Sequence, residues 1–288
     1  MRLTLGTAQF GMNYGISNLS GKIPDDELTR LIELARASGV TTLDTAAVYG
    51  DSEKRIGNAA TSGFRIITKV PKIPKTPLSP DQWLRYRVNQ SLRNLQRDCI
   101  DVLLLHCPSD LESENGGALI RELQALKRNS VIRRFGYSVY SPSELARLTA
   151  ILTPDCVQVP VNIFDRRFID SGALNSLFLQ GIEVFARSIF LQGLLLMPPQ
   201  KRPIYFKRWG ALLASYDAWL RERGLSAVEA NVQFIRGQEQ LSSAVIGVAS
   251  SQELGEVLSV FNDPKIPVDN DFSIQDELLL NPSMWRTT

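Results

Sequence analysis

The stretch Ile100-Asp101-Val102-Leu103-Leu104-Leu105-His106 is the most informative part of the chain. An apolar run of this length is typical of a strand buried on both faces of a parallel sheet. Its final residue, His106, is the only histidine in the sequence. A lone histidine on an apolar strand is more often a core residue than a ligand. Its role therefore depends on which residues end the neighbouring strands.

Short apolar runs of this kind alternate with segments of helical periodicity along the whole chain. We expect strands over 3–8, 40–44, 65–70, 100–105, 134–138, 157–160, 183–187 and 243–246. We expect helices over about 24–38, 53–60, 81–96, 118–127, 142–150, 171–179, 208–223, 227–236 and 251–261. The chain thus consists of repeated strand–helix units with no break in composition between them.

Eight such units predict an α/β fold, a closed (β/α)8 barrel of the TIM type, because such barrels are built from eight strands and run to ~250 residues. We expect residues 1–288 to form a single domain, with 262–288 as a C-terminal tail across the barrel surface. A doubly wound open sheet is the alternative. It would need a glycine-rich fingerprint after the first strand, and the glycines of Gly6-Thr7-Ala8-Gln9-Phe10-Gly11 are too far apart for one.

The bulk composition excludes several classes of protein. The chain is 44% hydrophobic and 22% charged with a net charge of +2, so nothing indicates a nucleic acid or a membrane surface as partner. The N-terminus lacks the apolar core of a signal peptide. Three cysteines (Cys99, Cys107 and Cys156) without paired spacing favour a reduced, cytoplasmic protein, and one histidine argues against a metal site.

Polar residues stand at the ends of three consecutive strands. Asp44 ends the second strand, Tyr49 follows it in the loop, Lys69 lies in the third strand and His106 ends the fourth. Each could be structural by itself, since an aspartate at a strand end is often a cap or turn residue. A purely structural role is hardest to assign to Lys69, because an ammonium group in an apolar strand is costly unless it is paired. Asp44, one strand away, is the natural partner.

These four side chains form a coherent acid catalyst. A neighbouring ammonium group is expected to lower the pKa of the tyrosine, which is ~10 when unperturbed. A carboxylate would keep the lysine charged and in place. The imidazole could orient a carbonyl oxygen, so that the tyrosine protonates the developing alkoxide when a hydride arrives at the carbonyl carbon.

Four motifs in this order resemble the aldo-keto reductase superfamily. They are Gly6-Thr7-Ala8-Gln9-Phe10-Gly11, Leu43-Asp44-Thr45-Ala46-Ala47-Val48-Tyr49-Gly50-Asp51-Ser52-Glu53, Thr68-Lys69-Val70 and Asp101-Val102-Leu103-Leu104-Leu105-His106. The later stretches 136–140 and 158–162 extend the match to nearly the whole chain. The resemblance implies that Tyr49 is the general acid, that Lys69 and Asp44 tune it, and that His106 orients the substrate carbonyl.

The resemblance also implies a nicotinamide cofactor, NADP(H) or NAD(H). The residues that it would contact are Gly6, Thr7, Ser138, Gln158, Asn162, Arg187, Ser188, Gln192, Gly247, Ser250 and Ser251. Backbone N–H groups at the loop after the last strand suit an anion, although Ser250 and Ser251 could equally cap the last helix. We expect Phe10, Cys107, Tyr140 and Phe164 to line the substrate pocket, with plain packing as the alternative.

Two departures from the family pattern concern the cofactor. Arg187 stands where the family stacks an aromatic ring on the nicotinamide, and a planar guanidinium can stack but is charged. Glu253 stands near the position where NADPH-preferring members carry an arginine, and a carboxylate there would repel a 2′-phosphate. The choice between NADPH and NADH stays open at this point.

The leading hypothesis is a cytoplasmic NAD(P)H-dependent reductase that converts an aldehyde or ketone to an alcohol. Small polar residues after His106 are compatible with sugar-like or small aliphatic carbonyls. One alternative is a nucleotide-binding sensor or accessory subunit with the same fold and little turnover. Another is a barrel enzyme that retains its cofactor for an internal redox isomerisation or elimination. The sequence does not indicate the oligomeric state.

Overall fold

Eight parallel strands form a closed barrel in the order of the chain. The computed structural model describes residues 1–75, 78–114, 116–269 and 271–286. The strands are β1 (Arg2–Gly6), β2 (Thr42–Asp44), β3 (Arg65–Val70), β4 (Ile100–Leu105), β5 (Ile132–Ser138), β6 (Cys156–Pro160), β7 (Glu183–Arg187) and β8 (Ser243–Gly247). The barrel closes where β1 pairs with both β2 and β8, with Leu5 opposite Leu43 on one side and Ile246 on the other.

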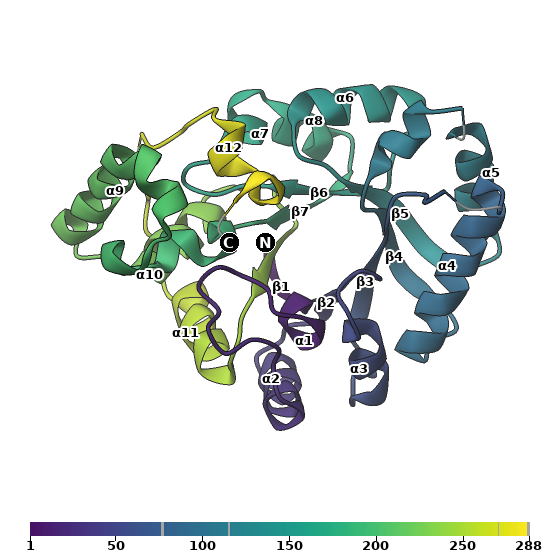
Figure 1. Ribbon diagram of the computed structural model, residues 1–288, viewed down its shortest axis with the longest axis horizontal. Coiled ribbons are helices and arrows are strands. Elements are labelled where there is room, and N and C mark those ends of the chain that lie inside the picture. The colour runs from purple at the N-terminus through teal and green to yellow at the C-terminus, as the bar shows by residue number, and fades with distance from the viewer. Residues whose placement is uncertain (76–77, 115, 270, 287–288) are drawn as a thin grey trace.

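The helices lie outside the strands (Figure 1). They are α1 (Ala8–Gly11), α2 (Asp25–Ala37), α3 (Ser52–Asn58), α4 (Pro80–Leu95), α5 (Gly116–Arg128), α6 (Pro142–Ile151), α7 (Arg167–Asp170), α8 (Ala173–Leu179), α9 (Gly210–Arg223), α10 (Ala227–Arg236), α11 (Ser251–Asn262) and α12 (Glu277–Leu280). The predicted (β/α)8 barrel is confirmed. The first strand is shorter than expected because α1 begins at Ala8.

Serine residues start three of the outer helices. The hydroxyl oxygens of Ser141, Ser226 and Ser250 accept hydrogen bonds from backbone N–H groups in the first turns of α6, α10 and α11. Such caps satisfy donors that the helix itself leaves free, and each stabilises a helix by ~1 kcal/mol. They fix where each helix begins relative to the strand before it.

The interior of the barrel changes from apolar to polar along its axis. Ile67, Val102, Leu104, Cys156 and Phe185 form one buried cluster inside the barrel. Polar side chains follow at the carboxyl ends of the strands, where several are almost fully buried: Asp44, Lys69, Ser138 and Gln158. The carboxyl ends of barrel strands are where active sites are found in this architecture.

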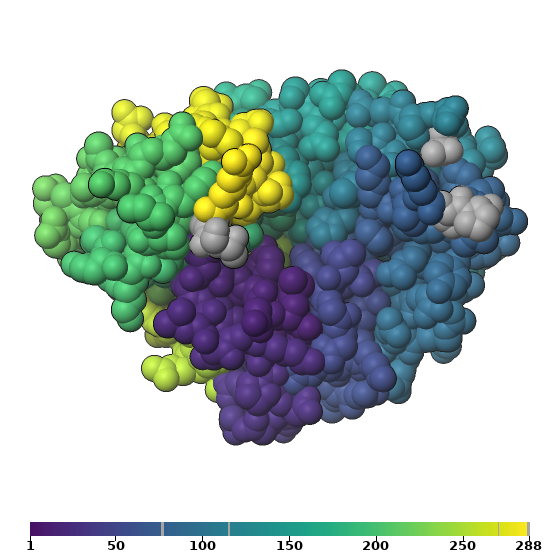
Figure 2. Space-filling view, viewed as in Figure 1, coloured from purple at the N-terminus to yellow at the C-terminus, as the bar shows by residue number. Residues whose placement is uncertain are grey.

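The segment after α11 is held by specific contacts with the α9 side of the barrel. The Tyr205 hydroxyl donates to the backbone oxygen of Leu278 at 2.9 Å, and the Trp209 indole N–H donates to Asp276 at 3.0 Å. Figure 2 shows this segment in yellow against the green surface of residues 200–225. In the described part of the chain, no helix combines the length and apolar character needed to cross a membrane.

Candidate active site

A buried ion pair lies at the carboxyl ends of β2 and β3. Lys69 Nζ is 2.6 Å from Asp44 Oδ2 and also donates to the backbone oxygen of Thr45 at 2.9 Å. The Gln158 amide donates to the other oxygen of Asp44, Oδ1, at 2.8 Å. Burial lowers the pKa of Lys69, and the Asp44 carboxylate opposes this effect. The carboxylate thereby has a partner on each oxygen, and the positive charge of the lysine is balanced inside the protein.

Tyr49 lies beside this pair. Its ring centroid is 5.2 Å from Lys69 Nζ and 6.2 Å from the His106 ring, which it meets edge-on at 85°. Burial raises the pKa of Tyr49, Asp44 raises it further, and the Arg187 guanidinium lowers it. The sequence predicted that Lys69 would lower this pKa. Arg187 is the opposing cation instead, because the charge of Lys69 is balanced by Asp44. Tyr49 is protonated at neutral pH and is thus a potential proton donor.

His106 follows the last residue of β4 and faces the same space. Its backbone N–H donates to the Val70 oxygen at 2.9 Å, which continues the pairing of β3 and β4 by one residue. Burial, together with the charges of Lys69 and Arg187, lowers the pKa of His106 to about 3. The imidazole is neutral at physiological pH, so it can donate one hydrogen bond without carrying a charge.

Arg187, at the end of β7, is a cation without a carboxylate partner among the described residues. Its guanidinium lies 4.2 Å from the Tyr140 ring centroid and donates to the Val139 oxygen and the Ser188 hydroxyl. Its Nε atom is buried without a hydrogen-bond acceptor in the described structure. Since a partly buried charge without a counter-ion is costly, this group is suited to a ligand that supplies negative charge or a planar surface.

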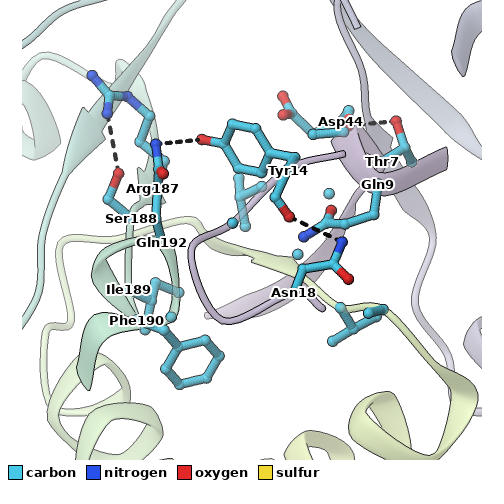
Figure 3. Close-up of a pocket in the computed structure, with 18 of the residues that line it drawn as sticks. Thr7, Gln9, Tyr14, Asn18, Asp44, Arg187, Ser188, Ile189, Phe190 and Gln192 are labelled. Atoms are coloured by element: carbon cyan, nitrogen blue, oxygen red, sulfur yellow. Dashed lines mark hydrogen bonds between the residues drawn. The ribbon is translucent and has the colours of Figure 1, made fainter. Parts of the chain in front are cut away.

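One cavity joins these groups to most of the residues predicted to hold a cofactor. The predicted residues that line it are Gly6, Thr7, Asp44, Tyr49, His106, Ser138, Tyr140, Gln158, Arg187, Ser188, Gln192 and Gly247. Lys69 lies behind Tyr49 and is 1% exposed. Figure 3 shows the cavity between the Arg187–Gln192 segment and the segment that carries Thr7, Gln9, Tyr14 and Asn18.

The features of this cavity fit a nicotinamide dinucleotide. Two polar atoms at its wall, Gln9 Oε1 and Arg187 Nε, are buried without partners in the described structure. A side chain at Gly247 would approach the Gln9 amide to 3.0 Å, so glycine keeps this part of the channel open. The same cavity is lined by Tyr49 and also by Glu253 in the first turn of α11.

Several predicted residues lie elsewhere. Phe10 and Phe164 are fully buried and pack in the core rather than along the cavity, so for these two residues the alternative of plain packing holds. Phe164 meets the rings of Tyr216 and Phe272 edge-on. Cys107 is an exposed free thiol at the rim, outside the residues that line the cavity.

Asn162, Ser250 and Ser251 also lie outside the cavity lining. The Asn162 amide donates to the Ser188 oxygen at 3.0 Å and accepts the backbone N–H groups of residues 164 and 165. It positions the loop that follows β7. Ser250 caps α11, as the alternative interpretation predicted, through a 3.2 Å hydrogen bond from the Glu253 N–H.

A second loop at the cavity was not predicted from the sequence. Tyr14 stacks at a tilt 6.3 Å from the Tyr49 ring, and the Gln192 amide contacts its hydroxyl at 3.4 Å. Burial raises the pKa of Tyr14 to about 12. The backbone N–H of Ile16 donates to the Gln192 oxygen at 3.1 Å, which joins the loop after α1 to the loop after β7. The turn at Gly15, with φ of +95°, was the available signal in the sequence.

Comparison with known proteins assigns the chain to a family. The family model "Aldo/keto reductase family" matches residues 2–278. The uncharacterized oxidoreductase YcsN of Bacillus subtilis is 32% identical over 171 residues, and this match spans 52% of the chain and 56% of that protein. L-galactose dehydrogenase of Arabidopsis thaliana is 24% identical over 94% of the chain and 90% of its own length.

A solved structure shares the fold. The holo form of the aldo-keto reductase AKR11C1 from Bacillus halodurans superimposes with a TM-score of 0.73 at 20% identity, covering 92% of this chain and 88% of that one. This chain belongs to the aldo/keto reductase family and is an NAD(P)-dependent oxidoreductase.

Proposed function

We propose that the protein reduces an aldehyde or ketone to an alcohol with Tyr49 as the proton donor. The observation that carries this proposal is the grouping of Tyr49, His106 and the Asp44–Lys69 pair at one end of a cavity that fits a dinucleotide. When bound, the reduced cofactor supplies the hydride for the carbonyl carbon. The phenol of Tyr49 supplies the proton for the carbonyl oxygen, so that one hydride and one proton convert the carbonyl to an alcohol.

The other residues act around that proton transfer. The neutral His106 ring donates a hydrogen bond to the carbonyl oxygen and sets its orientation toward Tyr49. The Asp44–Lys69 pair lies directly behind the phenol and fixes its surroundings, with the lysine charge balanced by the carboxylate. Arg187 is the cation that lowers the pKa of Tyr49, so its charge favours the phenolate left by proton transfer.

We propose a small, polar carbonyl compound as the substrate, with sugar-like compounds as the first class to test. The walls near the proton donor carry the hydroxyl groups of Tyr14, Tyr140 and Ser138. Hydroxyl groups of this kind suit a polyhydroxylated ligand. A relative that covers nearly the whole chain is named an L-galactose dehydrogenase, which supports the same class of substrate.

We further propose a cytoplasmic location, on the basis of three free cysteines.

The test is the oxidation of NADH and of NADPH by the purified protein in the presence of aldose sugars and small aldehydes. We expect one alcohol formed per reduced cofactor consumed, with deuterium from a labelled cofactor appearing on the product carbon. Tight dinucleotide binding without turnover across the panel would favour a sensor or accessory subunit. Conversion of substrate without net consumption of cofactor would favour an internal redox reaction.

A further inference from the structure

The part of the cavity around Tyr49 and His106 carries one positive charge that the described residues do not balance. The charges of Asp44 and Lys69 cancel, because the carboxylate and the ammonium group are 2.6 Å apart. His106 is neutral at physiological pH, because its pKa is lowered to about 3. The guanidinium of Arg187 remains, and among the described residues its side-chain hydrogen bonds go to uncharged oxygens only.

This cation belongs to the wall of the space in which the proposed reaction takes place. Arg187 and Tyr140 line the cavity together with Tyr49 and His106. The charge of Arg187 lowers the pKa of both Tyr49 and His106, so it acts on the proton donor and on the group that orients the carbonyl. A small substrate held between those two side chains is therefore within the electrostatic reach of the guanidinium.

The guanidinium is held in place but keeps donors free for a ligand. One terminal nitrogen donates to the Val139 oxygen at 3.1 Å and the other to the Ser188 hydroxyl at 3.2 Å (Figure 3). Each terminal nitrogen carries a second N–H group, for which the described residues supply no acceptor. The nearby Glu144 carboxylate accepts the Tyr140 backbone N–H at 2.8 Å and forms no ion pair with Arg187.

We propose that Arg187 makes this a site for carbonyl compounds that also carry a carboxylate group. A carboxylate accepts two parallel N–H groups from a guanidinium, and such charge-assisted hydrogen bonds are about twice as strong as neutral ones. A neutral polyol would leave the positive charge of the cavity unbalanced. The hydroxyl groups of Tyr14 and Tyr140 would contact the uncharged part of the same substrate, so acidic sugars fit both features.

The inference rests on the proposed function, because it assumes that a carbonyl group is reduced beside Tyr49. A role for Arg187 toward the cofactor alone predicts a different result. In that case the replacement Arg187→Met weakens binding of the reduced cofactor and slows charged and neutral substrates by the same factor. A role in carboxylate binding instead changes the ratio between a charged substrate and its neutral counterpart.

The experiment compares pairs of aldehydes that differ only in this charge. The pairs are D-glucuronate with D-glucuronamide and succinic semialdehyde with its amide. We expect kcat/KM of the wild type to be at least about tenfold higher for the carboxylate of a pair than for the amide, the effect of one hydrogen-bonded charge. We expect the difference to lie mainly in KM, because the carboxylate is remote from the reacting carbon.

The variants assign this preference to one side chain. In Arg187→Met the ratio of carboxylate to amide should fall to about one, beyond the loss of rate that both substrates share. Arg187→Lys keeps the charge without the two-pronged geometry and should keep part of the preference. Arg93→Met removes the same charge from an exposed position on α4, outside the cavity lining, and should leave the ratio unchanged.

A second measurement needs no turnover. The alcohols γ-hydroxybutyrate and its amide cannot accept a hydride, so titration calorimetry in the presence of the reduced cofactor measures their binding alone. We expect the wild type to bind the carboxylate at least about tenfold more tightly, and Arg187→Met to bind both equally.

Equal or faster reduction of the amides by the wild type would overturn the inference, as would reduction of neutral aldehydes without reduction of either carboxylate. A ratio that is unchanged in Arg187→Met would also overturn it. These results would leave carbonyl reduction intact. Absence of reduction of any aldehyde, charged or neutral, would overturn the proposed function itself.

Discussion

The Lys69 ammonium lies 2.6 Å from the Asp44 carboxylate, and the two side chains are 1% and 6% exposed. Gln158 holds the second oxygen of Asp44, so the whole group is both buried and hydrogen-bonded. A buried ion pair contributes little net stability, but removing one partner leaves the other charge buried alone. The pair consequently fixes the positions of β2 and β3 directly behind Tyr49.

Replacing Lys69 with methionine should destabilise the protein by ~3 kcal/mol or more, because the Asp44 charge loses its counter-ion in a buried site. The double variant Asp44→Asn/Lys69→Met removes both charges and should be more stable than Lys69→Met alone. Urea unfolding followed by circular dichroism measures the difference. Equal stability of Lys69→Met and the wild type would show that the pair is not energetically coupled.

The single histidine should make stability depend on pH in a defined direction. The pKa of His106 is lowered to about 3 in the folded protein, from an ordinary value of 6.5. The unfolded chain therefore binds the proton first, and stability is full above pH 6.5 and is lost as the pH falls below it. Between about pH 7 and pH 5.5 the free energy of unfolding should fall by about 1 kcal/mol from this group.

The variant His106→Gln has no group that titrates in that range at this position. Its free energy of unfolding, measured by urea unfolding, should fall less than that of the wild type over the same pH interval. The difference between the two profiles isolates the histidine from the carboxylates that titrate at lower pH. Parallel profiles for the two proteins would mean that His106 is accessible to protons in the folded state.

Arg187 should assist the reaction through its charge. Arg187 lowers the pKa of Tyr49, so its replacement with methionine should leave the phenol a weaker acid and lower kcat/KM by about tenfold. Arg187→Lys keeps the charge but loses the planar contact with Tyr140. Its kcat/KM should lie between that of the wild type and that of Arg187→Met. Arg93→Met, at an exposed position on α4, is the matched control. Undiminished kcat/KM in Arg187→Met would remove the arginine from the mechanism.

Much of the fold could be predicted from the sequence because the apolar runs and helix starts are local signals. Strand β4 (Ile100–Leu105) and helix α10 (Ala227–Arg236) have the predicted bounds. Residues at the carboxyl ends of neighbouring strands lie at the same end of a closed barrel. The proximity of Asp44, Lys69 and His106 could therefore be predicted from the order of the strands. Their chemistry indicated a site before any distance was known.

Contacts between loops and between distant helices could not be predicted in this way. Ser251 and Glu27 are 224 residues apart in the chain and meet only because β1 pairs with β8. The contact of Tyr14 with Gln192 depends on a left-handed turn at Gly15, and such loop conformations have no periodic signal. Phe10 and Phe164 were predicted to line the substrate pocket but are buried in the core. An aromatic residue near a strand end can pack into the core as easily as it can line a pocket.

The central claim, that Tyr49 donates the proton, is tested most directly by Tyr49→Phe. The hydroxyl is the only group removed, so the cavity shape and the Asp44–Lys69 pair stay in place. Tyr86→Phe, at a position on α4 that is 49% exposed, is the control for the same chemical change. We predict that kcat/KM for aldehyde reduction falls at least about 100-fold in Tyr49→Phe, with dinucleotide affinity retained and the control unaffected. Carbonyl reduction at the wild-type rate in Tyr49→Phe would contradict the account.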